Sequence, residues 1–122
     1  MQLAAKKVSA VVSGDYYQAL FDSDDRDWGE QVGTFDQAEP YVLVQRQFES
    51  FDGGKCYIES HDEEYIGHFE LKLVEFSATR LAYEIARSDR TFVEVTFAVT
   101  EAEFEEARAI IEVIFGLREP GW

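Results

Sequence analysis

Alternating apolar and polar positions predict short β-strands over most of the chain. Residues 7–12 alternate weakly, and residues 41–48 and 55–59 follow with the same two-residue period, which sends successive side chains to opposite faces of a sheet. The most regular alternation is in residues 91–99, whose odd-numbered positions hold only threonine, valine and phenylalanine. Turn residues separate the strands, as in the Asp-Gly-Gly sequence of residues 52–54, and such short connections favour an antiparallel meander.

Two stretches leave alternatives open. Residues 16–21 fit either a short helix or a strand, because their apolar positions suit both periods. Residues 68–76 predict a strand with its first apolar residues on one face, but Val74 and Phe76 fall on the other face. Either both faces of this strand are partly covered, or a β-bulge resets the alternation within it.

Residues 100–115 predict the one helix of the chain. Thr100 is a typical N-cap residue, and Glu103 three positions later completes a capping box. Gly116 is the residue expected just beyond the C-terminal end. Apolar residues recur at steps of three and four and form a single stripe that suits packing on a sheet. The stripe consists of Phe104, Ala107, Ile111 and Ile114.

These elements predict one α+β domain over residues 1–122, because a chain of this length supports a single core. An antiparallel sheet of five or six strands, most of them within residues 41–99, carries the helix of residues 100–115 on one face. A hairpin across residues 88–90 closes the sheet before the helix. Residues 22–40 are rich in acidic residues and contain chain breakers, so we expect a long exposed loop there.

Charge narrows the classes of function. The sequence holds 11 basic and 25 acidic residues, which gives a net charge of −14. This charge repels phosphate and anionic lipid, so we expect no nucleic-acid partner and no membrane partner. No apolar run approaches the roughly 18 residues that cross a bilayer, and the first residues lack the apolar core of a signal peptide. With Cys56 as the single cysteine, these features indicate a cytoplasmic protein.

Candidate sites for metals and for catalysis are weak. An EF-hand loop that begins at Asp22 would need glycine where Asp27 stands, although a looser calcium site in the acidic loop is an alternative. Cys56, His61 and His68 lack the close spacing that is typical of zinc ligands. The sequence also lacks a G-x-S-x-G elbow and a phosphate-binding glycine loop. We therefore expect no metal, no cofactor and no enzymatic activity, and we interpret Cys56 as a buried strand residue.

Acidic residues gather in three clusters, at positions 22–27, 62–64 and 101–106. The third cluster is explained by the helix N-terminus, which favours negative charge, whereas the first two have no such folding reason. Trp28 lies beside the first cluster and Tyr65 beside the second, and aromatic residues amid charge are typical of interface hot spots. The alternative is a solubilising coat. The candidate partner-binding residues are Asp24, Asp25, Asp27, Trp28, Glu30, Asp62, Glu63, Glu64 and Tyr65.

Residues 41–116 resemble the immunity protein ten family of bacterial polymorphic toxin systems. The resemblance lies in YVLVQRQFE (41–49), in CYIESHDE (56–63) and in FVEVTFAVTEAEFEEARAIIEVIFG (92–116), a strand that leads into a capped acidic helix. Residues 1–40 match in general character alone. The resemblance implies a non-enzymatic protein that neutralises a toxin encoded alongside it, and it assigns no partner contact to a particular residue.

Three functions are therefore weighed. The first is an immunity protein that occludes a basic protein toxin, with carboxylates meeting lysines and arginines and with Trp28 and Tyr65 supplying buried area; a nuclease suits this charge best. The second is a small-ligand site near His61 and His68. The third is a self-associating structural domain in which residues 91–99 form an edge strand. The protein is accordingly expected to be a monomer or a homodimer.

Overall fold

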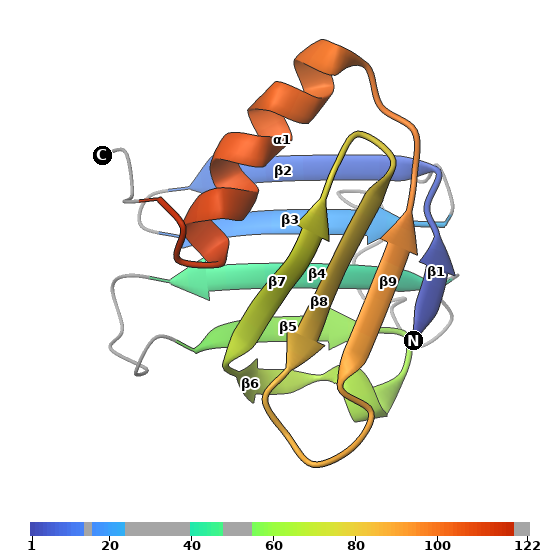
Figure 1. Ribbon diagram of the computed structural model, residues 1–122, viewed down its shortest axis with the longest axis vertical. Coiled ribbons are helices and arrows are strands. Elements are labelled where there is room, and N and C mark those ends of the chain that lie inside the picture. Colours follow the sequence, from blue (N-terminus) through green and yellow to red (C-terminus); the bar gives the residue numbers. More distant parts are fainter. Residues whose placement is uncertain (14–15, 24–39, 48–54, 119–122) are drawn as a thin grey trace.

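The computed structural model describes residues 1–13, 16–23, 40–47 and 55–118, and it contains two β-sheets and one long helix (Figure 1). The larger sheet has five antiparallel strands that follow one another in chain order. This arrangement confirms the predicted α+β class and the antiparallel meander. Its strands are β2 (Lys7–Ser13), β3 (Tyr16–Asp22), β4 (Tyr41–Gln47), β5 (Cys56–Ser60) and β6 (Gly67–Phe69).

A second sheet of four strands, in the order β1-β9-β8-β7, was not foreseen from the sequence. Its strands β7 (Leu71–Phe76), β8 (Arg80–Ile85) and β9 (Phe92–Thr96) are antiparallel, whereas β1 (Gln2–Ala4) runs parallel to β9. Because β9 lies between β1 and β8, the expectation that residues 91–99 form an edge strand is wrong. The physical reason is β1, whose three residues are too short to show a period.

The helix α1 (Glu101–Ile114) and the four-stranded sheet lie side by side across one face of the five-stranded sheet (Figure 1). The strands of the two sheets cross steeply, and the core fills the space between the layers. Burial of each large apolar side chain in such a core contributes about 1.5–3 kcal/mol to stability. The largest fully buried side chains include Phe21, Ile58, Leu81, Tyr83, Ile111 and Ile114.

The helix begins and ends as the sequence predicts. The Thr100 hydroxyl accepts a hydrogen bond from the Glu103 backbone (3.2 Å), and the Glu103 carboxylate accepts one from the Thr100 backbone (2.9 Å). Gly116 has a positive φ of 76°, which glycine adopts without steric cost. The backbone N–H groups of Gly116 and Leu117 then satisfy the last helical carbonyls. The stripe packs inward, with Ala107, Ile111 and Ile114 buried.

Residues 68–76 form two strands in different sheets, so the prediction of a single strand is wrong. Glu70 lies between β6 and β7, where the chain passes from one layer to the other. Of the two alternatives that the sequence left open, the structure contains the bulge, because the pairing of β7 with β8 shifts register between Leu73 and Glu75. Val74, the extra residue, is 50% exposed.

Of the predictions for single residues and short stretches, some are confirmed and others are wrong. Residues 16–21 form a strand rather than a helix, and Asp22 belongs to the end of that strand and is fully buried, which corrects its assignment to an exposed loop. Cys56 is buried and its thiol donates to the Ile114 carbonyl (3.3 Å). The predicted turn at residues 52–54 lies outside the described residues. Within the described part, no helix is both long and apolar enough to span a bilayer.

Candidate partner-binding site

The described half of the predicted site is an acidic turn, residues 61–65, which follows β5 and contains the 3-10 helix η3 (Glu63–Tyr65). The side chain of Asp62 caps η3 by accepting a hydrogen bond from the Glu64 backbone (3.0 Å). The Ser60 hydroxyl accepts from the Asp62 N–H (3.0 Å) and donates to the Asp62 carbonyl (2.9 Å). Short polar side chains thus fold the turn locally, as Ser and Asp do in many loops.

Arg87 joins the acidic turn to the hairpin between β8 and β9. Its guanidinium lies 5.0 Å from the ring centre of Tyr65 and 5.1 Å from that of Phe69, which is the range of cation–π contacts. The same group donates to the Glu64 carbonyl (2.7 Å) and twice to the Arg90 carbonyl (2.8 and 3.1 Å). The turn is therefore held in one position by contacts from a distant part of the chain.

The three carboxylates of the acidic turn have different structural roles. Asp62 is the cap, and Glu64 forms an exposed ion pair with Arg90 (3.1 Å). Glu63 is exposed, and its side chain makes no hydrogen bond or ion pair with the described part of the chain. Among the carboxylates of the acidic turn, Glu63 is thus the one without a contact to the described residues.

Tyr65 lies in the core rather than at the surface. It is 8% exposed, and its hydroxyl accepts a weak hydrogen bond from the amino group of Met1 (3.4 Å). Its ring also packs against Arg87. Tyr65 therefore has little free area for a partner, and its role differs from that of the expected contact residue. It holds the acidic turn against the core.

Ser23 and Pro40, which flank residues 24–39, lie at the same end of the five-stranded sheet as the acidic turn. Ser23 donates its N–H to the Pro40 carbonyl (3.0 Å), so the two flanks of the segment lie together. Tyr41 then donates its N–H to Nδ1 of His61 (3.2 Å), the first residue of the acidic turn. The predicted contacts within the segment lie outside the described residues. They are Asp24, Asp25, Asp27, Trp28 and Glu30.

His61 and His68 are both exposed, and each packs against a different tyrosine. The His61 ring centre is 6.5 Å from that of Tyr41, and the His68 ring centre is 5.2 Å from that of Tyr57. Partial burial, with a hydrogen bond to Glu59, raises the pKa of Tyr57 to about 12. The described residues include no group of three His, Cys, Asp or Glu side chains arranged to hold a metal ion.

The third acidic cluster lies at the N-terminal end of α1, away from the acidic turn (Figure 1). Hydrogen bonds from the backbone and side chain of Thr100 lower the pKa of Glu103, which keeps this carboxylate ionised. The cap and the helix dipole give this negative charge a folding role, as expected from the sequence.

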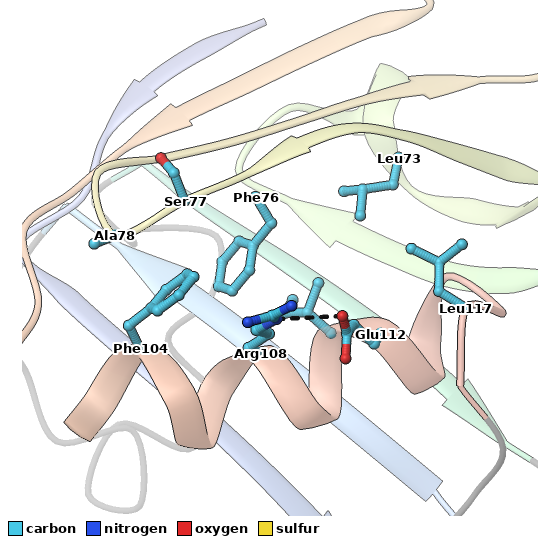
Figure 2. A pocket seen from close by; sticks show the side chains of 9 residues that line it. Leu73, Phe76, Ser77, Ala78, Phe104, Arg108, Glu112 and Leu117 are labelled. Atoms are coloured by element: carbon cyan, nitrogen blue, oxygen red, sulfur yellow. Dashed lines mark hydrogen bonds and ion pairs between the residues drawn. The ribbon is translucent and has the colours of Figure 1, made fainter. Parts of the chain in front are cut away.

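Sequence reasoning missed an apolar groove of about 430 Å³ between β7 and α1 (Figure 2). Phe76 and Phe104 stack along it with ring centres 5.2 Å apart. Arg108 pairs with Glu112 across its helical wall (3.3 Å). The spacing of Phe104, Arg108 and Glu112 on one helix face was the available signal, but the pairing of that face with β7 depends on the second sheet.

Comparison with protein-family models and with curated proteins gives no relative that guides the assignment of function. No protein-family model matches the chain, and no curated protein is significantly similar to it. The functional inference therefore rests on the charge and geometry of this surface.

Proposed function

We propose that this chain is a non-enzymatic binding protein that captures a basic protein partner through the end of the sheet that carries the acidic turn. We further propose that the partner is a toxin which the chain neutralises, as the resemblance of residues 41–116 implies. One observation carries the proposal: Glu63 is an exposed carboxylate without a structural contact in the described part, on a turn that Arg87 and Asp62 hold rigidly.

The fixed position of the acidic turn favours a binding role for its carboxylates over the alternative of a solubilising coat. A coat keeps a protein soluble through charge alone and needs no fixed geometry. A partner site gains from carboxylates that are already in place, because less conformational entropy is then lost on association. The bonds from Arg87 to the Glu64 and Arg90 carbonyls supply such preorganisation.

The net charge of −14 is expected to raise the rate at which a basic partner associates with the protein. Opposite charges steer two proteins together and raise association rates well above the unsteered range of about 10⁵–10⁶ M⁻¹s⁻¹ at low salt. The mechanism is occlusion, in which lysines and arginines around the cleft of a toxin meet the carboxylates of Asp62 and Glu63. A nuclease is the preferred partner because its substrate channel is basic.

Residues 24–39 are proposed to act together with the acidic turn. Ser23 and Pro40 bring the chain into and out of residues 24–39 next to His61. The proposal assigns the acidic and aromatic residues of this segment to the same partner. These residues are Asp24, Asp25, Asp27, Trp28 and Glu30.

The test is to mix the purified protein with the product of the gene adjacent to its own. We expect a stable complex, protection of cells that express that product, and an association rate that falls steeply as ionic strength rises. A small-ligand site would show little response of this kind to salt. Absence of both the complex and the protection would refute the proposal.

A further inference from the structure

Among the described residues, β2 forms a long outer edge of the five-stranded sheet. All seven of its residues pair with β3 without a register shift, and β2 is the outermost strand of the five-stranded sheet. No strand of the described residues pairs with its other side. Backbone N–H and C=O groups on such an edge form a template on which a further strand can add.

The other sheet edges within the described ranges are protected in ways that β2 is not. The end strands β1 and β6 have three residues each, and β7 contains the bulge at Val74. Short strands and bulges are two means by which natural proteins prevent pairing between edges. Within the described residues, β2 is therefore the sheet edge that is both long and free of a register shift.

Two exposed valines lie on opposite faces of β2. Val11 is 42% exposed and Val12 is 49% exposed, and consecutive strand residues point to opposite sides of a sheet. Val12 shares a face of β2 with Val8 and Ala10, which line a groove together with residues of α1, so it lies on the face that carries α1. A strand added beside β2 would cover both valines with its own apolar side chains.

A groove of about 230 Å³ between β2 and α1 supplies a charge preference. The exposed carboxylates of Glu103 and Glu106 line it together with Val8, Ala10 and Ala107. Glu103 uses one carboxylate oxygen, Oε1, to cap the helix, which leaves the other free for a cation. A lysine or arginine on the added strand would reach this pair of carboxylates.

We propose that β2 and the N-terminal half of α1 bind an extended segment of a basic protein, which adds to the sheet as a further strand. Its apolar side chains cover Val11 and Val12, and a cationic side chain meets Glu103 and Glu106. A second copy of this chain is the poorer occupant, because two molecules of net charge −14 repel each other. The inference rests on the proposed function for the basic nature of the partner, but β2 and the acidic turn lie at opposite edges of the sheet.

The probe is a blocked seven-residue peptide, Val-Val-Lys-Val-Val-Lys-Val, which presents both valine and lysine on each face when extended; it is titrated into ¹⁵N-labelled protein and followed by NMR. We expect the amide signals of residues 7–12 and 101–107 to shift and the free-edge amides of β2 to gain protection from hydrogen exchange. A peptide with glutamate in place of lysine, and a lysine peptide with a central proline, should produce neither effect, since proline interrupts strand pairing.

Several results would overturn the inference. Shifts confined to residues 61–65 would mean that the peptide binds by charge at the acidic turn, which supports the proposed function alone. Equal shifts with the proline peptide, or no shift at all, would exclude strand addition. Shifts of β2 that depend on protein concentration without peptide would identify a second copy as the occupant.

Matched variants sharpen the test. Val12→Lys places a charge on the free edge and should weaken peptide binding at least about tenfold, whereas Val74→Lys changes an equally exposed valine on β7 and should leave it unchanged. Glu106→Gln should weaken binding about threefold, the size expected for an exposed ion pair. Glu103→Gln should act similarly and keep the helix cap, because glutamine also completes a capping box. Equal effects of Val12→Lys and Val74→Lys would refute the site.

The product of the adjacent gene separates this inference from the proposed function. If the wild type and Val12→Lys bind that product equally well, the docking site on β2 is wrong and the proposed function stands. If neither binds it while the peptide still shifts β2, the proposed function is wrong and the docking site stands.

Discussion

The start of α1 and the start of η3 share one sequence pattern but differ in what the pattern does. Thr100 and Asp62 each cap a helical segment, and acidic residues follow in both first turns. The helix α1 runs for 14 residues and η3 for three, so a substantial helix dipole exists in α1 alone. Negative charge therefore has a folding reason at Glu103, and no equivalent reason at Glu63.

This difference shows that a count of carboxylates does not locate a binding surface. Glu103 and Glu63, one from each capped turn, differ in the contacts that the side chain already makes within the fold. Glu103 accepts the Thr100 N–H and Glu64 pairs with Arg90, whereas Glu63 has no such contact within the described residues. A carboxylate without such a contact, as Glu63 is, has both oxygens available to a partner.

The largest expected effect comes from releasing the acidic turn. Arg87→Ala removes the hydrogen bonds to the Glu64 and Arg90 carbonyls and the contact with Tyr65, and should cost about 2 kcal/mol of unfolding free energy. Urea denaturation measures this loss. A cost below about 0.5 kcal/mol, in the range of ordinary surface substitutions, would show that Arg87 does not hold the turn in place.

Removing the two caps compares the segments directly. Thr100→Ala should destabilise the protein by about 1 kcal/mol, because a long helix loses its N-cap. Asp62→Ala should cost roughly 0.5 kcal/mol, at the low end for caps, since a three-residue element depends on few cooperative bonds. Thermal and urea unfolding of both variants check the order, and a larger loss for Asp62→Ala would reverse the comparison.

Acid titration gives a smaller effect with a defined sign. The Thr100 cap lowers the pKa of Glu103 in the folded state, so the ionised carboxylate of Glu103 stabilises the fold. This stabilisation is present above the unfolded pKa and is lost as the pH falls through the folded pKa. Thr100→Ala removes the side-chain hydrogen bond but keeps the larger backbone one, so the pKa of Glu103 should move only part of the way back towards its usual value, as measured by NMR of ¹³C-labelled carboxyl groups. An unchanged pKa in this variant would show that the Thr100 side chain does not contribute to the shift.

The elements that sequence could predict are those with local causes. The cap of α1 at Thr100, its end at Gly116 and the inward face of β9 depend on neighbouring residues, and all are present. The division of the strands between two sheets was not predictable, because alternation is the same in either sheet. The parallel pairing of β1 with β9 joins residues some ninety positions apart and leaves no periodic signal.

The candidate site was predictable in part for a similar reason. The carboxylates of Asp62, Glu63 and Glu64 stood out by composition, but their separate roles depend on distant partners. Arg87 could not be linked to Tyr65 from the sequence, since their contact requires the two sheets to meet. For the same reason, a tyrosine beside an acidic turn resembled an interface residue and is a core residue.

The most direct test of the central claim is the association rate of Glu63→Lys with the product of the adjacent gene at low salt. The matched control is Glu70→Lys, the same charge change at an exposed residue between β6 and β7. We expect Glu63→Lys to slow association about tenfold and Glu70→Lys to slow it less than about twofold, with both variants as stable as the wild type. Equal slowing by the two substitutions would mean that overall charge, and not the acidic turn, governs capture.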